Sequence, residues 1–351
     1  MLLSGIFPAI TTPFYPDGRL YLRKLEHNVD RYSKTPIAGI VVLGSTGEAV
    51  SLTGEEQKDV LRVARENCAN EKVLVAGVGQ ESAQATLETI EVAAKLDYDV
   101  ALVRTPSYYR PQMKAKPESL LAYYRFVADK SPLPVLLYSV PVFTAFDLPV
   151  EHVAELSAHP NIIGIKESSG SVEKIAAMKQ ACEKLAVRRD VPVTNTFEAV
   201  TRRMTTPANG SNGNFVSAEA LGGTAVAAAA PPKLKTRTKN VGFQIAAGAA
   251  QTLLPSLQAG ASAAVLAFAA PAPTACLEVY AAWKDANDKL ADEKQQRITA
   301  AAQRIAAFGV PGVKYALDLN GYYGGNARLP LLPLTQAEKD EIAALMRDLR
   351  N

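Results

Sequence analysis

Residues 161–170 read Asn-Ile-Ile-Gly-Ile-Lys-Glu-Ser-Ser-Gly, an apolar run of strand character that ends in a charged amine, Lys166, and continues into a polar turn. Strands buried inside a parallel sheet read as continuous hydrophobic runs, so a lysine at the C-terminal end of one is costly unless it has a function. A desolvated lysine has a lowered pKa and attacks carbonyl groups as a free amine. The alternative is a lysine whose stem lies on apolar surface while its ammonium group reaches water. The rest of the chain decides between these interpretations.

The strand, turn and helix of this stretch belong to a pattern that repeats along the chain. The predicted strands are apolar, and several are rich in Val and Ile; they span 6–12, 39–44, 72–79, 100–105, 135–140, 162–166, 243–247 and 263–269. The helices predicted to follow them span 20–32, 53–67, 82–96, 117–129, 149–157, 171–185, 251–258 and 273–287. Strands that alternate with helices indicate parallel pairing, and eight such units predict a (β/α)8 TIM barrel over residues 1–288. A doubly wound α/β sheet is the alternative, but no GxGxxG motif follows the first strand.

Two segments depart from this alternation. Between the sixth helix and the seventh strand, about residues 187–240, the connection is far longer than the roughly 2–6 residues usual for such loops. It is rich in Asn, Gly, Ala and Pro and ends in a basic cluster. We expect a disordered insertion on the barrel face opposite the active site, and we expect activity to survive its deletion. Residues 289–351 have only helical patterns and predict a C-terminal helical extension packed on the barrel.

Composition narrows the class of protein. The chain has 351 residues, 48% of them hydrophobic, which suits one large domain with a sizeable core. A formal net charge of +3 is too small to indicate a nucleic-acid or membrane surface, and no apolar run approaches the roughly 20 residues of a membrane span. Cys68, Cys182 and Cys276 have no disulfide or zinc spacing, which favours a reducing compartment. The N-terminus has neither a signal nor a transit pattern, so we expect a cytoplasmic protein.

The strand ends supply residues for one kind of chemistry. The second strand ends in the stretch Gly-Ser-Thr-Gly-Glu with Ser45 and Thr46, and Tyr108 follows the fourth strand. Tyr138 lies near the end of the fifth strand, and the sixth ends at Lys166. In a TIM barrel these positions all meet at the C-terminal face. A lysine, a nearby tyrosine and a group of hydroxyls form a Schiff-base site: the amine condenses with a 2-oxo acid and the phenol moves protons. Taken singly, the tyrosines are more often core or interface aromatics, and the serine–threonine turn is equally well explained as a helix cap. Their joint placement at the strand ends of one barrel favours the functional interpretation.

No metal or cofactor is needed for this chemistry. The iminium ion is itself the electron sink, so a neighbouring C–C bond breaks to leave an enamine. The histidines, His27, His152 and His159, form no metal-ligand pattern and are interpreted as surface residues. The expected partner is therefore a small-molecule 2-oxo acid, with no nucleic acid and no membrane.

The motifs Gly-Ser-Thr-Gly-Glu at 44–48, Tyr108, Tyr-Ser-Val-Pro at 138–141 and Gly-Ile-Lys at 164–166 resemble those of the dihydrodipicolinate synthase / N-acetylneuraminate lyase family of class I, pyruvate-dependent barrels. The resemblance covers nearly the whole chain except about 187–240. It implies that Lys166 is the Schiff-base lysine and Tyr138 the central proton-transfer phenol. It also implies that Ser45 and Thr46 bind the pyruvoyl carboxylate and pass protons. Tyr108 matches a tyrosine that enters a neighbouring subunit's site, which implies a homotetramer built as a dimer of dimers.

Within the family, the resemblance is greatest to the 4-hydroxy-2-oxoglutarate aldolases of animals. Residues 308–314, Phe-Gly-Val-Pro-Gly-Val-Lys, and 321–325, Gly-Tyr-Tyr-Gly-Gly, are typical of that group. This implies that Ser168 and Gly248 contact substrate. Dihydrodipicolinate synthases carry an arginine where Phe143 stands here, and a phenyl ring does not replace a charged bidentate clamp. One departure is Thr46, where the aldolase group has asparagine.

These observations predict a Schiff-base carbon–carbon lyase that cleaves 4-hydroxy-2-oxoglutarate to pyruvate and glyoxylate. The alternatives are a 2-keto-3-deoxy sugar acid aldolase or dehydratase of the same family, with dihydrodipicolinate synthase less favoured. A catalytically silent barrel that acts by binding is the alternative from another class. Since animal members are mitochondrial, the resemblance leaves that compartment open beside the cytoplasm.

Overall fold

The computed structural model describes residues 1–194 and 236–349 of the chain. Its contacts divide it into two compact units. The larger unit comprises Leu3–Arg189 and Val241–Asn351, and the smaller comprises Met1–Leu2 and Asp190–Asn240. All residues predicted to act at the site belong to the larger unit.

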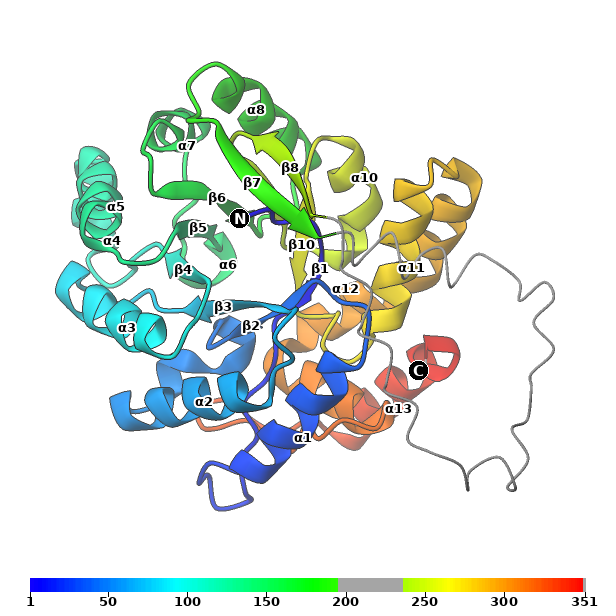
Figure 1. The fold of residues 1–351 in the computed structure, drawn as a ribbon. Helices are drawn as coiled ribbons and strands as arrows, with labels where there is room; N and C mark the ends of the chain where they lie inside the picture. The colour runs from blue at the N-terminus through cyan, green and yellow to red at the C-terminus, as the bar shows by residue number, and fades with distance from the viewer. Residues whose placement is uncertain (195–235, 350–351) are drawn as a thin grey trace, which may run out of the picture. The chain divides into compact units, whose positions relative to one another are not determined.

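A ring of eight parallel strands forms the centre of the larger unit, in the order β1-β10-β9-β6-β5-β4-β3-β2 (Figure 1). The strands are β1 Gly5–Pro8, β2 Gly39–Val42, β3 Val73–Gly77, β4 Val100–Arg104, β5 Val135–Ser139, β6 Ile162–Glu167, β9 Gln244–Ala247 and β10 Ala263–Leu266. A parallel bridge between Ala9 and Val41 closes the ring between β1 and β2. The predicted (β/α)8 TIM barrel is confirmed.

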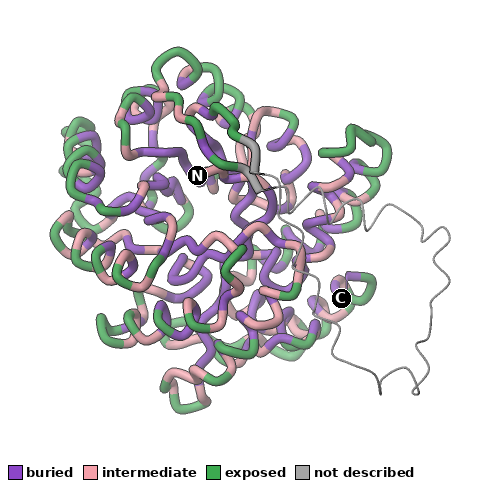
Figure 2. Tube along the Cα trace, in the orientation of Figure 1, coloured by how far each residue is buried: buried purple, intermediate pink, exposed green. Residues whose placement is uncertain are grey.

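Burial explains why the strands are almost entirely apolar. Every residue of β2, β5 and β6 is buried, since the barrel interior lies on one side of each strand and the helices on the other. Figure 2 shows buried chain along the central strands and exposed chain on the outer faces of the helices. Except for β6, which is one residue longer than predicted, the strands are shorter than predicted. β2, for example, ends before Leu43, whose φ of 59° leaves the extended region and begins a turn.

The barrel helices are α1 Leu22–Ser33, α2 Gly54–Asn67, α3 Ala83–Lys95, α5 Glu118–Lys130, α7 Val150–Ser157, α8 Val172–Glu183, α10 Leu253–Gln258 and α11 Pro273–Lys284. Their starts follow the sequence closely. Thr53 and Glu56 form a capping box, and Ser82 and Ser171 each accept a hydrogen bond as N-caps. Two short helices were not predicted, α4 Arg110–Ala115 and α6 Pro141–Thr144, and both lie in loops that follow strands. Within the described residues, no helix is both long enough and apolar enough to cross a lipid bilayer.

The C-terminal extension consists of α12 Asp288–Leu319 and α13 Gln336–Leu345, followed by a 3₁₀ turn at Arg347–Leu349. The predicted helical extension is confirmed, and α12 consists of two halves. The break lies at Gly309, whose φ of 66° and ψ of −149° are not helical, and Pro311 follows two residues later. This break gives the helix a second direction, and the extension is therefore able to follow the barrel surface.

The smaller unit differs from the prediction of a disordered insertion at about 187–240. Its described ends are strands, β7 Arg189–Thr194 and β8 Thr236–Val241, which form a two-stranded sheet. The error has a simple cause: Val and Thr alternate with other residues at both ends, but the composition of the middle dominates when the segment is taken as a whole. Residues 195–235 lie outside the described part of the chain, so disorder there and the position of the insertion stay predictions.

Candidate active site

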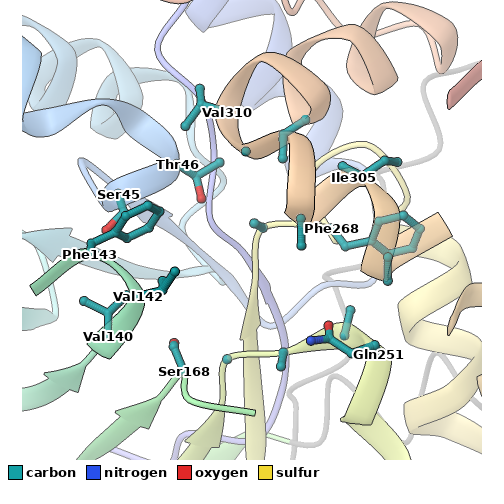
Figure 3. Close-up of a pocket in the computed structure, with 18 of the residues that line it drawn as sticks. Ser45, Thr46, Val140, Val142, Phe143, Ser168, Gln251, Phe268, Ile305 and Val310 are labelled. Carbon is teal, nitrogen blue, oxygen red and sulfur yellow. The ribbon is translucent and has the colours of Figure 1, made fainter. Parts of the chain in front are cut away.

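The carboxyl ends of the strands open into a cavity of about 300 Å³ (Figure 3). Of the residues predicted to act at the site, those that line this cavity are Ser45, Thr46, Tyr138, Lys166, Ser168 and Gly248. They follow or end strands β2, β5, β6 and β9, which are far apart in sequence. The barrel brings them together because all its strands point the same way.

Lys166 and Tyr138 are neighbours across two paired strands, since the register of β5 and β6 aligns them directly. The Lys166 side chain is buried, with 4% of the residue exposed, and its Nζ lies 4.2 Å from the centroid of the Tyr138 ring. No described residue forms an ion pair or a hydrogen bond with this amine, whereas the amine of the other buried lysine in the described chain, Lys314, forms both. The amine of Lys166 is thus held against a phenol ring and remains available to a ligand in the cavity.

The hydroxyl of Tyr138 meets the turn that follows β2. Its oxygen lies 3.3 Å from Ser45 Oγ, within hydrogen-bond distance. Ser45–Gly47 form a single 3₁₀ turn, and Glu48 ends it in a left-handed conformation with φ 55°. Such a turn presents backbone N–H groups and the Ser45 and Thr46 hydroxyls on one side, an arrangement that suits a carboxylate.

Ser168 and Gly248 form the next part of the cavity wall. Ser168 Oγ is buried and has no hydrogen-bond partner among the described residues, an arrangement that is costly unless a ligand or water supplies one. Gly248 makes the space for it: a Cβ at position 248 would lie 2.0 Å from Ser168 Oγ and 2.8 Å from the carbonyl oxygen of Glu167. A glycine is therefore required for the close approach of the two strands here.

We expect Gly248→Ala to reduce activity at least about 10-fold, because the added methyl group displaces Ser168 and the β6 backbone beside Lys166. The same overpacking should lower the free energy of unfolding by about 1–3 kcal/mol. Steady-state kinetics and thermal denaturation measure both effects.

The matched control is Gly54→Ala, at the start of α2, where an added Cβ meets nothing within 4 Å. This variant should retain wild-type activity. Wild-type activity in Gly248→Ala as well would show that the close approach has no bearing on the site.

Glu167 follows Lys166 but points out of the barrel, as alternation along a strand requires. Its side chain is fully buried, and its Oε2 lies 3.1 Å from Lys174 Nζ on α8. Its Oε1 accepts the Ser169 N–H at 2.7 Å. Lys174 also contacts Asp147, in the loop before α7. This charged cluster fixes the segment that carries Ser168 without entering the cavity.

Tyr108 does not line the cavity of its own chain. It is 78% exposed, and its ring packs edge-on against Tyr109. Its backbone is nevertheless fixed, because the carboxylate of Glu81 accepts the N–H groups of Ser107 and Tyr108 and pairs with Arg104. Although burial acts to raise it, these N–H groups and the guanidinium hold the pKa of Glu81 below its ordinary value. The role expected of Tyr108 in a neighbouring subunit stays a prediction.

The cavity also has a large apolar wall, of which the sequence indicated only Phe143. It includes Val140, Val142, Phe143, Phe268, Ala302, Ile305, Val310 and Val313. Figure 3 shows Ile305 and Val310 entering from α12, while Gln251 adds an amide from the segment after β9. Lys166 is the one charged side chain among the described residues that line this cavity. The C-terminal extension is thus part of the site. Residues on both sides of the Gly309 break in α12 line the cavity.

Comparison with known proteins agrees with this geometry. The sequence model of the dihydrodipicolinate synthetase family matches residues 2–188 and 228–349. The chain belongs to that family. The intervening residues 189–227 are not matched, and they lie within the predicted insertion.

Relatives and solved structures of the family cover between about half and all of the chain. A 4-hydroxy-tetrahydrodipicolinate synthase of Methanothrix thermoacetophila is 31% identical over 99% of this chain and 96% of its own length. One of Xanthomonas campestris is 42% identical over 51% of this chain and 58% of its own. A dihydrodipicolinate synthase structure from Bacillus anthracis has a TM-score of 0.78 at 22% identity, covering both chains completely. A family member from an E. coli K12 prophage, solved in complex with pyruvate, has a TM-score of 0.77 at 25% identity over 99% of each chain.

As a member of the dihydrodipicolinate synthetase family, the chain is an enzyme of the Schiff-base-forming carbon–carbon lyase class. Family membership does not identify which 2-oxo acid is the substrate. That choice depends on the polar groups around the cavity.

Proposed function

We propose that this enzyme is a class I aldolase that cleaves 4-hydroxy-2-oxoglutarate to pyruvate and glyoxylate, with Lys166 as the covalent catalyst. The observation that carries the proposal is the contact of the buried Lys166 amine, which no described residue pairs with, and the Tyr138 ring, whose hydroxyl lies within hydrogen-bond distance of Ser45 in the same cavity. An amine beside a proton-transfer phenol is the pair that imine chemistry requires.

The reaction follows from these groups. Lys166 Nζ attacks the C2 carbonyl, and loss of water from the carbinolamine leaves an iminium ion. Tyr138 accepts the proton of the 4-hydroxyl group, directly or through Thr46 and the neighbouring subunit's Tyr108. The C3–C4 bond breaks, its electron pair enters the iminium to form an enamine, and glyoxylate leaves. Protonation of the enamine at C3 and hydrolysis of the imine release pyruvate and restore the amine.

The turn after β2 would hold the C1 carboxylate of the substrate. Ser45 and Thr46 supply hydroxyls on the cavity side, and the 3₁₀ turn supplies backbone N–H groups. Pyruvate in the structure of the prophage relative supports a site for a small 2-oxo acid in this family.

The other end of the cavity favours a short substrate whose second carboxylate is bound by uncharged hydrogen-bond donors. Among the described residues, the polar groups there are the Gln251 amide and the buried Ser168 Oγ, which has no hydrogen-bond partner in that part of the chain. The volume of about 300 Å³ lies at the lower end of the range for ligand sites. Two neutral donors and a small volume suit the distal carboxylate of a five-carbon acid.

A second candidate is 4-hydroxy-tetrahydrodipicolinate synthase, which the 31% identity to the Methanothrix enzyme favours. The cavity argues against it, because Phe143 stands where the synthases place an arginine. Phe143 lines the cavity mouth and is 63% exposed, and no arginine is among the described lining residues. A phenyl ring provides neither the charge nor the paired donors of a guanidinium group.

Assays of the purified protein with separate substrates test the choice. We expect release of glyoxylate and pyruvate from 4-hydroxy-2-oxoglutarate with a kcat/KM at least about 10²-fold above that for 2-keto-3-deoxy sugar acids. Formation of 4-hydroxy-tetrahydrodipicolinate should be negligible. Activity confined to the sugar acids, or a dominant synthase activity, would refute the proposed substrate while leaving the imine chemistry intact.

We further propose that Tyr108 completes the site of a neighbouring subunit in a homotetramer. Its exposed ring and its backbone fixed by Glu81 support this role. Analytical ultracentrifugation measures the oligomeric state. A protein that is monomeric by this measurement and fully active in the aldolase assay would contradict the proposal.

A further inference from the structure

A second lysine, Lys314, is buried even more completely than Lys166 and has no part in the proposed reaction. It lies in α12 after the Gly309 break, and its side chain is 0% exposed. Its Nζ lies 2.6 Å from Oε1 of Glu48, whose side chain is 1% exposed. A buried ion pair thus joins the C-terminal helix to the residue that ends the carboxylate-binding turn.

Such a pair contributes little net stability, because removing both charges from water offsets their attraction. Burial lowers the pKa of Lys314, and the Glu48 carboxylate opposes this shift. A buried ion pair often stabilises no better than apolar residues of the same size, so its presence favours a role in fixing geometry. The remaining donors of Lys314 are directed as well: Nζ donates to the carbonyl oxygens of Thr12 at 2.9 Å and Asn326 at 2.8 Å.

These contacts converge on the turn through two routes. The first is Glu48 itself, which has a φ of 55° that residues other than glycine rarely adopt and that the surroundings must impose. Glu48 Oε2 also accepts the Arg328 N–H at 2.8 Å. The second route is Thr12, which accepts from Lys314 and donates its hydroxyl to the Gly47 carbonyl oxygen at 2.7 Å. Lys314 therefore holds both residues that close the turn, Glu48 directly and Gly47 through Thr12.

We propose that Lys314 is a positioning residue, and that its ion pair with Glu48 holds the Ser45–Gly47 turn in the shape that binds the carboxylate of a 2-oxo acid. The inference rests on the proposed function only for the placement of that carboxylate. The C-terminal helix then acts on substrate affinity at a turn more than 260 residues earlier in the sequence.

Pyruvate trapping measures this effect without any aldehyde substrate. Borohydride reduces the imine on Lys166, and mass spectrometry gives the pyruvate concentration that half-saturates trapping. Removing one charge alone, as in Lys314→Met, strands the other in the core and should destabilise the fold. The informative variant is therefore the double substitution Glu48→Gln with Lys314→Met. We expect it to recover most of the lost thermal stability and yet to need at least about 10-fold more pyruvate, with the rate at saturation little changed.

A second variant keeps the test decisive if the double substitution does not fold. Thr12→Val retains the shape of the side chain and removes only the hydrogen bond to Gly47, so we expect about a 3-fold or greater rise in half-saturating pyruvate. The control is Asn320→Ala, which removes buried hydrogen bonds from the C-terminal segment to Pro271 and Leu349, far in sequence from the turn. It should lower the melting temperature and leave pyruvate trapping unchanged.

The outcomes separate this inference from the proposed function. Wild-type half-saturation in the double variant, or in Thr12→Val if the double variant does not fold, overturns the positioning role alone, provided that the wild-type protein traps pyruvate. A rise of the same size in Asn320→Ala would also overturn it, because general destabilisation would then explain the effect. Failure of the wild-type protein to trap pyruvate overturns the imine chemistry and this inference with it.

Discussion

Replacing Lys166 with alanine is expected to abolish the covalent pyruvate adduct and to lower turnover by at least about 10⁴-fold, the scale lost when a covalent nucleophile is removed. The fold should survive, because no described residue forms an ion pair with the Lys166 amine that its loss would leave broken. Lys166→Arg should fail equally, since a guanidinium group stays protonated and forms no imine. Borohydride reduction with pyruvate, followed by peptide mass spectrometry, measures the adduct.

Lys72 provides the matched control. Burial lowers the pKa of Lys72, and its amine donates to the carbonyl oxygens of Thr35 and Ile37. It precedes β3 and so lies at the amino end of the strands, away from the cavity. Lys72→Met should keep the adduct on Lys166. An adduct that persists in Lys166→Ala, or that maps to another lysine, would contradict the assignment of Lys166 as the covalent catalyst.

Tyr138→Phe should lower kcat by about 10²–10⁴-fold, the usual contribution of a general acid–base group. The phenyl ring that contacts Lys166 remains, and only the hydroxyl that meets Ser45 is lost. We therefore expect borohydride still to trap the pyruvate imine, but more slowly, while the melting temperature changes little. Steady-state and single-turnover kinetics separate imine formation from C–C cleavage.

The control is Tyr124→Phe. Burial raises the pKa of this tyrosine, and its hydroxyl is bonded to Thr105 Oγ1 at 3.1 Å, outside the cavity lining. Loss of this hydroxyl should lower the free energy of unfolding by about 1 kcal/mol and leave kcat unchanged. If Tyr138→Phe has no larger effect on kcat than Tyr124→Phe, the phenol does not transfer the proton.

Local sequence signals predicted the barrel because each of them reports on a few neighbouring residues. Continuous apolar runs mark strands buried on both sides, and Thr53 with Glu56 marks a helix start by a hydrogen-bonded box. Where the structure differs, the signal was either diluted or absent. The strands β7 and β8 were lost in the composition of a long segment, and α4 and α6 are short helices set by loop contacts.

The site shows the same division. Lys166 and Tyr138 were predicted because they end apolar strands, and strand ends meet in a barrel. Ile305 and Val310 carry no such signal, since an apolar residue on an amphipathic helix looks the same whether it faces a core or a ligand. The sequence did not indicate Gln251 as a cavity residue either, because only the close approach of its loop to the cavity distinguishes it from other polar residues.

The sequence by itself therefore determined the parallel barrel, the alternation of its strands and helices along the chain, and the amine at the end of β6. It could do so because hydrophobic periodicity and helix capping are local properties. Tertiary structure decided what surrounds that amine. The break at Gly309 turns α12 over the cavity, and the Lys314–Glu48 pair joins residues that no local pattern connects. Contacts between distant segments depend on how whole elements pack, and packing is fixed only when the chain is folded.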